Sequence, residues 1–250
     1  VAGETIGGSL APAQRYERAL ATHLKDQLDN LTRREEVMAA EILRTGKVVV
    51  SGDGYPAQTV NFGRDEALTK ALASSATWDS SGVNPVDDLE DWAITIQDKS
   101  GVVAKTVVMD PQAWKIFRSN ETVQKYLDIR RGTSNSLAID PVLRSEDAKA
   151  RNVGSIGDFD IWVYNDTYIN DAGATTKLLP EKTVLLGSRE GLEGTRCYGA
   201  IHDEKANWTA NRYFTKSWLE EDPSVRWLLL QSAPLVVPYR PNASMCVTVG

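Results

Sequence analysis

The chain has 250 residues, of which 42% are hydrophobic and 25% are charged, and its formal net charge is −6. That length and apolar content suffice for one large domain or for two modest domains, each with its own core. The acidic balance disfavours binding to phosphate backbones along the whole chain, and no apolar run approaches the roughly 20 residues that a membrane-spanning helix needs.

The cysteine count points away from a disulfide framework or a redox site. Cys197 and Cys246 are the only cysteines, and they lie far apart in no spacing typical of a metal or redox motif. We therefore expect two buried thiols that behave as small hydrophobic side chains.

The spacing of apolar residues predicts one long helix over residues 12–45. The steps are three or four residues, with Glu35 bridging the single gap, along the series Tyr16, Leu20, Leu24, Leu28, Leu31, Met38 and Ile42. Pro12 suits the first turn, and Gly46 suits the position just past the end. At 1.5 Å per residue such a helix is about 50 Å long, whereas the average helix has about three turns. It therefore needs a long partner surface, either a sheet or neighbouring subunits.

The next hundred residues predict a hairpin, several short helices and one strand. Residues 47–50 are a β-branched run, residues 51–54 have turn composition and residues 58–62 alternate, which together indicate a hairpin. Asn84 and Asp110 each precede a proline and are expected to cap the helices that follow. The helices are predicted over residues 65–74, 85–96, 111–117 and 121–129, and the strand over residues 106–109.

Strands dominate the predicted C-terminal half. They are expected over residues 159–164, 183–186, 196–201, 213–218, 225–237 and 245–249. The run from Trp227 to Leu230 is apolar without interruption, so the strand over residues 225–237 should be buried on both faces. The order of elements indicates an α+β fold with two sub-domains, in which the chain leaves the first and returns to it late.

The sequence contains few residues at spacings typical of catalytic or metal sites. Adjacent carboxylates such as Glu35-Glu36 point about 100° apart on a helix and do not share a site. His23 lies on or beside the apolar stripe of the long helix, and His202 follows Cys197 by five residues, which on one strand places the two side chains on opposite faces. We find no ligand spacing for zinc or calcium. The sequence therefore predicts no enzyme activity, no catalytic residue, no metal and no cofactor, and it favours a structural or interaction role.

Two short segments are candidate subunit interfaces. Arg130 and Arg131 lie in a segment of loop composition, and they suit either a solvated loop or a contact with carboxylates or nucleic acid. Tyr213, Phe214 and Trp218 form an aromatic stretch that suits either core packing or a subunit contact. We take Arg130, Arg131, Tyr213 and Trp218 as the interface candidates.

Several blocks, in one order along the chain, resemble the major capsid proteins of lambda-like tailed bacteriophages. They include Val60-Asn61-Phe62-Gly63-Arg64, Asp110-Pro111-x-x-Trp114-x-x-Phe117-Arg118-Ser119, Leu127-Asp128-x-Arg130-Arg131-Gly132, Gly157-Asp158-x-x-Ile161-x-Val163-Tyr164, Arg196-x-Tyr198-Gly199 and Gln231-Ser232-Ala233-Pro234-Leu235. No single block is diagnostic, but their common order from about residue 60 to residue 235 is hard to obtain by chance.

The resemblance implies the Hong Kong ninety-seven-like capsid fold, with a peripheral domain built on a long spine helix and an axial domain. By that likeness the peripheral domain takes residues 1–70, with the spine helix at 12–45, and residues 205–237. The axial domain takes residues 71–204, and residues 238–250 supply its final strand. An N-terminal arm and an extended hairpin normally precede the spine helix. The chain begins at Val1 without these elements, so we expect a trimmed chain that cannot close a normal shell.

The resemblance also implies the function and the partners. It implies a structural subunit of an icosahedral phage or prophage head, which assembles into pentamers and hexamers around double-stranded DNA. Further partners would be a decoration protein, a scaffold and a portal, with DNA bound only non-specifically and no membrane contact. The subunit would be found in the virion, and in the host cytoplasm during assembly. Two alternatives stay open at this point: an encapsulin-like shell of a bacterial compartment, and a small α+β hydrolase using a serine, Cys197 or His202.

Overall fold

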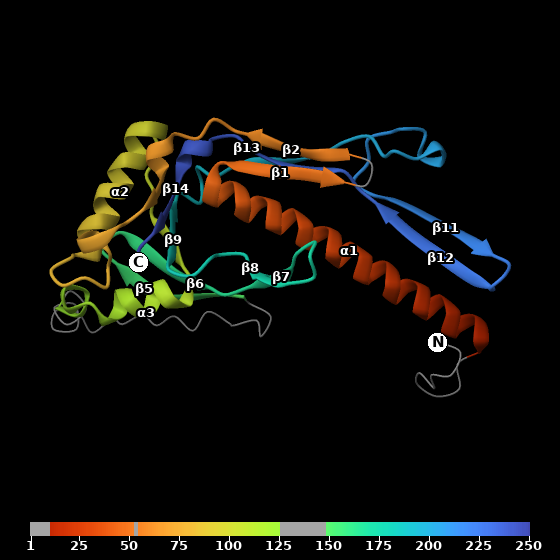
Figure 1. The fold of residues 1–250 in the computed structure, drawn as a ribbon, viewed down its shortest axis with the longest axis horizontal. Helices are drawn as coiled ribbons and strands as arrows, with labels where there is room; N and C mark the ends of the chain where they lie inside the picture. Colours follow the sequence, from red (N-terminus) through yellow and green to blue (C-terminus); the bar gives the residue numbers. More distant parts are fainter. Residues whose placement is uncertain (1–10, 53–54, 126–148) are drawn as a thin grey trace. The chain divides into compact units, whose positions relative to one another are not determined.

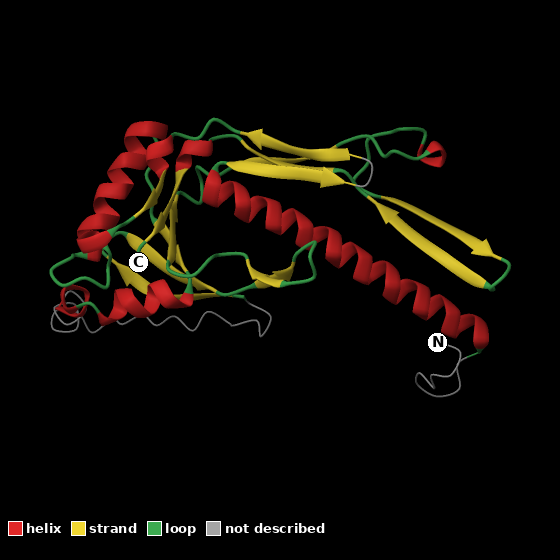
Figure 2. Cartoon of the chain, in the orientation of Figure 1, coloured by secondary structure: helices red, strands yellow, loops and turns green. Residues whose placement is uncertain are grey.

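A computed structural model describes residues 11–52, 55–125 and 149–250 of the chain. Helices and strands are both abundant (Figure 1 and Figure 2), which agrees with the predicted α+β class. The chain divides into two compact units. The first comprises Val1–Glu36 and Arg196–Val236, and the second comprises Val37–Thr195 and Val237–Gly250. The domain boundaries drawn from the resemblance stay a prediction.

The predicted long helix is confirmed as α1 (Pro12–Thr45). Gly46 follows it with φ +70°, and its N–H donates to the carbonyl of Ile42 at 2.7 Å. Only glycine adopts this left-handed conformation without cost, which is why it ends the helix. Burial of the apolar stripe increases along α1: Tyr16 is exposed, the leucines from 20 to 31 are half-buried, and Met38 and Ile42 are buried.

Arg64 holds the C-terminal end of α1 within the second unit. Its side chain is buried, and its two terminal nitrogens donate to the carbonyls of Leu43 and Leu68, both at 2.6 Å. The last carbonyls of a helix lack partners inside the helix, and a cation there also complements the helix dipole. Gly46 lies against this side chain, since a Cβ at position 46 would approach the Cβ of Arg64 to 2.5 Å.

The predicted hairpin after α1 is confirmed, but the predicted helix over residues 65–74 is wrong. Strands β1 (Lys47–Gly52) and β2 (Tyr55–Asn61) pair antiparallel. They are followed by the 3-10 turn η1 (Glu66–Leu68), strand β3 (Thr69–Ala71) and a second 3-10 turn, η2 (Ser74–Ala76). Pairing of β3 with the C-terminal strand β14 overrides the local helical preference, because the sheet satisfies the backbone groups of β3.

The core of the second unit lies against a six-stranded mixed sheet. Its order is β3-β14-β9-β4-β6-β5, and its further strands are β14 (Ser244–Thr248), β9 (Thr183–Gly187), β4 (Thr106–Met109), β6 (Phe159–Tyr164) and β5 (Ala150–Ile156). The strand predicted over residues 159–164 is confirmed as β6, and it buries Phe159, Ile161 and Val163 on one face. Strand β5 and the small hairpin β7 (Thr167–Ile169) and β8 (Thr175–Lys177) were not predicted, because they carry few apolar residues.

Helices α2 (Pro85–Ser100) and α3 (Pro111–Ser119) share the buried core with this sheet. The predicted caps are confirmed: Asn84 accepts from the N–H of Val86, and Asp110 accepts from the N–H groups of Gln112 and Ala113. The end of the helix predicted over residues 121–129 lies outside the described residues, although residues 121–125 are helical.

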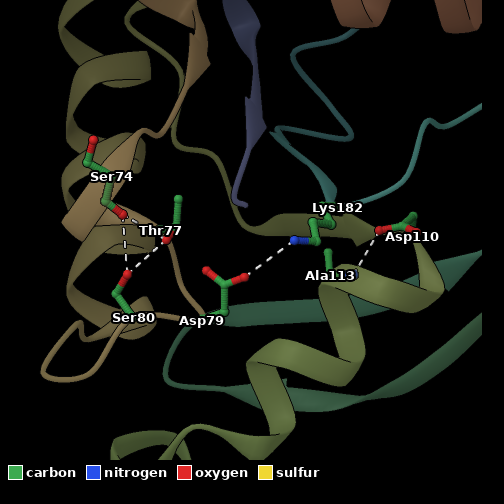
Figure 3. Close-up of polar contacts among 7 residues, drawn as sticks. All are labelled: Ser74, Thr77, Asp79, Ser80, Asp110, Ala113 and Lys182. Carbon is green, nitrogen blue, oxygen red and sulfur yellow. Dashed lines mark hydrogen bonds and ion pairs between the residues drawn. The ribbon is translucent and has the colours of Figure 1, made fainter.

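Trp78 joins the two helices from a polar turn. Its ring stacks on Trp92 of α2 at 5.7 Å between centroids and is tilted against Phe117 of α3 at 5.5 Å. Figure 3 shows the turn that presents it, in which Thr77 and Ser80 both donate to the carbonyl of Ser74. In the same view Lys182 pairs with Asp79 at 3.3 Å, and Asp110 caps α3. A polar turn thus fixes the more deeply buried of the two buried tryptophans of the second unit.

The first unit contains the hairpin of β11 (Phe214–Glu220) and β12 (Val225–Gln231). The predicted single strand over residues 225–237 is wrong, because Ser232 and Ala233 separate β12 from β13 (Pro234–Pro238), which pairs with β10 (Gly194–Tyr198). The predicted burial on both faces is also wrong. Trp227 is 49% exposed and residues 228–230 are half-buried, because β11 and β12 pair only with each other among the described strands.

The two cysteines differ in environment. Cys246 is buried, as predicted, but Cys197 is exposed, so that prediction is wrong for Cys197. Cys197 lies on β10, in a two-stranded sheet that leaves it open to solvent. Burial raises the pKa of the Cys246 thiol, and the nearby charges of Arg64 and Arg44 oppose this only partly.

We expect Gly46→Ala to destabilise the protein more than Gly63→Ala. Both glycines have φ near +70°, so both substitutions cost about 1 to 2 kcal/mol of backbone strain. A Cβ meets nothing within 4 Å at Gly63, whereas at Gly46 it collides with Arg64, which adds about 1 to 3 kcal/mol. Urea denaturation of the two variants measures the difference, and equal losses would show that Arg64 does not pack tightly against the helix end.

We expect one cysteine thiol to react rapidly with a thiol reagent in the folded protein, and both thiols to react rapidly in urea. Exposed Cys197 should react with a thiol-specific disulfide reagent at pH 8, whereas buried Cys246, whose raised pKa keeps it protonated at that pH, should react only after unfolding. Cys197→Ser should remove the fast phase, and Cys246→Ser should leave it intact. Fast reaction of both thiols in the native protein would contradict the buried position of Cys246.

Candidate subunit interface

The first unit buries very little apolar surface. Among its described residues, residues 11–36 and 196–236, the buried apolar side chains are Ile201 and Ala206, whereas the second unit buries some thirty. A domain is normally stabilised mainly by burial of apolar side chains. Fully buried apolar side chains therefore contribute little to the stability of the first unit.

The β11–β12 hairpin carries an exposed aromatic pair. Trp218 and Trp227 stand directly opposite each other, with ring centroids 6.2 Å apart and planes 17° from parallel, and they are 41% and 49% exposed. Trp227 donates from Nε1 to a carboxylate oxygen of Glu220 at 2.7 Å, and the Nζ of Lys216 lies 5.7 Å from the Trp218 ring centroid. These contacts hold both rings in place at the surface, so the pair is ordered before any partner covers it.

The other face of the hairpin is turned to α1 within the first unit. Gln27 of α1 donates to the carbonyl of Leu228 at 3.2 Å, and Arg226 lies over the ring of Tyr16. Successive side chains of a strand point to opposite faces, so Trp218 and Trp227 face away from the helix. We call the surface of Trp218, Trp227 and Val225 on this outer face the aromatic face.

Glu35, the polar gap in the apolar stripe of α1, is one of the most buried charged residues. Its side chain is 2% exposed and accepts from the hydroxyl of Tyr198 at 2.9 Å. Arg196 lies 3.3 Å from its other oxygen, an ion pair whose geometry falls short of a hydrogen bond. Partial burial, together with the hydrogen bond to Glu35 and its charge, raises the pKa of Tyr198. Glu35 thereby ties α1 to β10, and its burial explains why the apolar series skips one step.

The four predicted interface residues fall in different places. Arg130 and Arg131 lie outside the described residues. Tyr213 and Trp218 are both exposed on the first unit, the former just ahead of β11 and the latter within it. Sequence reasoning missed Trp227, Leu219 and Val225, which are also exposed on this hairpin. The register of the hairpin, which pairs Trp218 with Trp227, was the missing information.

Both histidines lie at the surface. His202 is exposed and meets the edge of Trp208, with ring centroids 4.3 Å apart. His23 is exposed on α1. In residues 11–52, 55–125 and 149–250 no group of three or more histidine, cysteine or acidic side chains is placed to hold a metal ion. In the same residues no helix is both long enough and apolar enough to cross a membrane.

Comparison with known proteins supplies the family. The family described as phage major capsid protein E matches residues 2–249. The major capsid proteins of Escherichia phage lambda and Escherichia phage N15 are each 30% identical to this chain over 246 residues, which is 96% of this chain and 70% of theirs. The P21 prophage-derived major head protein of Escherichia coli O6:H1 (strain CFT073) is 29% identical over 242 residues, covering 95% of this chain and 70% of that protein.

A solved structure agrees at the level of the fold. The crystal structure of a prophage protein of E. coli CFT073 that is assigned as a capsid protein superposes with a TM-score of 0.78 at 23% identity, covering 99% of this chain and 74% of that one. The resemblance seen in the sequence is thus confirmed. The chain belongs to the phage major capsid protein E family, and it is a structural subunit of a phage or prophage head, located in the virion.

Proposed function

We propose that this subunit assembles through the aromatic face of its first unit and that the resulting capsomers are pentamers and hexamers. Membership of a capsid family implies self-assembly into a shell. The observation that supports the aromatic face as a contact is the exposed, ordered pair of Trp218 and Trp227 on a unit with almost no core of its own. The family match leaves neither the compartment shell nor the hydrolase with support.

The energetics favour such a contact. Nearly half of each indole is uncovered, and covering both in an assembly stabilises it by a few kcal/mol. Aromatic residues held rigidly at a surface are the side chains that contribute most at protein interfaces. Tyr213, which precedes β11 and is exposed, stays a proposed interface residue outside the aromatic face.

The role proposed for the subunit is mechanical and involves no catalysis, cofactor or metal. Pentamers and hexamers would close an icosahedral head around double-stranded DNA, with a portal, a scaffold and a decoration protein as further partners. The net charge of −6 supports only non-specific contact with the packaged DNA, because an acidic wall repels the phosphate backbone. Arg130 and Arg131 stay proposed contacts to carboxylates of a neighbouring copy.

We expect Trp218→Ser to block assembly while leaving the separate subunit folded. An exposed residue of a two-stranded ribbon contributes about 1 kcal/mol or less to the stability of the subunit, whereas its loss removes much of the proposed contact. Sedimentation velocity and negative-stain electron microscopy of the protein expressed from its complete gene measure assembly, and thermal unfolding measures the fold. Tyr239→Ser, which alters an exposed aromatic residue of the second unit, is the matched control. Shells from Trp218→Ser at the parent yield would contradict the proposal.

A further inference from the structure

A groove of about 470 Å³ on the second unit gathers positive charge in an acidic protein. It lies between α3 and the edge of the sheet, and it is lined by Lys115 and Arg118 of α3, by Lys149, and by Arg151 of β5. We call these four residues the basic groove. Lys115 and Arg118 follow Pro111 at helical spacing, so they share one face of α3. Among the described strands β5 is the last in the sheet order, so the groove lies beside an edge strand.

Among the described residues, little of this charge is compensated by an ion pair. Lys149 pairs with Asp166 at 3.0 Å. Of the residues that the structure describes, none forms an ion pair within 4 Å of Lys115, Arg118 or Arg151. The ring of Trp114 also lines the groove and is half-buried, which adds an apolar contact surface. The groove therefore suits a ligand that brings several carboxylates and one apolar side chain.

The outer face of α2 has that composition. Asp87, Asp91, Ile94 and Asp98 recur at steps of four, three and four residues, so they form one stripe along the helix. All four are exposed, and Ile94 is 56% exposed in the middle of the acids. We call these four residues the acidic stripe. Across the described part of the chain, none of its three carboxylates pairs with a cation within 4 Å.

The local electrostatics agree that negative charge accumulates on α2. The pKa of Asp88, next to the stripe, is raised, first by burial and then by repulsion from Asp91 and Asp87. The hydrogen bond from Trp78 to Asp88 at 2.8 Å opposes this shift without reversing it. A cation brought to the stripe by another molecule would relieve that repulsion.

The two surfaces occupy different parts of the same unit. Helix α2 packs over β9 and β14, whereas α3 packs over β4 and β6, next to β5. Figure 1 shows the two helices as separate elements of the second unit. A surface that binds a different surface on the next copy forms a head-to-tail contact, which closes into a ring when the rotation permits. Rings are what the proposed pentamers and hexamers require.

We propose that the basic groove of one subunit receives the acidic stripe of α2 from a second copy, with Ile94 placed against Trp114, as a lateral contact within the capsomer. This inference rests on the capsomers proposed above. The occupant is a copy of this chain because the family assembles into a shell and because this chain itself carries the complementary surface. Long cationic side chains opposite carboxylates set the register and partner choice of such a contact.

The test reverses charge on each surface and then on both. Lys115→Glu/Arg118→Glu should lower the assembled fraction about tenfold or more, and so should Asp87→Lys/Asp91→Lys. The quadruple variant combines both pairs of substitutions, so its groove is acidic and its stripe is basic. The two surfaces are again opposite in charge, and assembly should largely recover. Lys105→Glu/Arg189→Glu makes the same change of net charge as Lys115→Glu/Arg118→Glu, but at exposed positions of the second unit outside the groove. It is the matched control for the groove variant and should assemble like the parent.

A mixing experiment separates a head-to-tail ring from other contacts. When the two double variants are mixed in equal amounts, each acidic groove meets a basic stripe and each basic groove meets an acidic stripe. Alternation is possible in a six-membered ring and impossible in a five-membered one, so hexamers should return without pentamers. Native mass spectrometry of the protein from its complete gene counts the ring members.

Each outcome decides one question. If the parent protein forms no capsomers, the proposed function fails. If the parent assembles and both double variants, shown to be folded by thermal unfolding, assemble equally well, only this inference fails. Failure of the quadruple variant to recover, with its fold intact, would also overturn the pairing. If the groove variant assembles normally but retains a short DNA duplex less well than the Lys105→Glu/Arg189→Glu control, the groove binds phosphate instead.

Discussion

The scarcity of buried apolar surface in the first unit governs most of what this chain can do. Ile201 and Ala206 are its buried apolar side chains among the described residues, while a stacked tryptophan pair remains at the surface. Such a unit does not follow the usual rule that apolar area is removed from water within one chain. Such a surface is expected in a shell subunit, because a neighbouring copy can cover it.

The second unit, by contrast, buries its apolar side chains in a conventional hydrophobic core. A mixed sheet is covered by α2 and α3, and Trp78 fills the space between the two helices. Its rigid interior leaves the outer surfaces of the helices free to carry charge, acidic on α2 and basic beside α3. The chain thus presents exposed aromatic rings on one unit and exposed charge on the other, and we propose both as contacts between copies. Apolar contacts supply stability, and charge pairs restrict the register in which subunits meet.

Helix α1 contributes residues to both units, and polar groups fix it at specific points. In the first unit the buried carboxylate of Glu35 receives the hydroxyl of Tyr198, and in the second unit Arg64 holds the carbonyl of Leu43 near the helix end. Buried polar contacts of this kind add little net stability, but they are costly to leave unpaired. They therefore specify the position of the helix more precisely than apolar packing alone can.

The amino-acid sequence alone was enough to predict both ends of α1, the first residues of α2 and α3, and the family. Pro12, Gly46, Asn84 and Asp110 act through local backbone chemistry, so their neighbours in sequence suffice to predict the helix ends. Which apolar residues of the strands are buried depends on tertiary packing. Trp227 and its neighbours look like a buried strand, yet they lie on a two-stranded ribbon, and Thr69–Ala71 became a strand because β14 lies beside it. Burial and strand pairing depend on residues distant in sequence, and no local pattern contains that information.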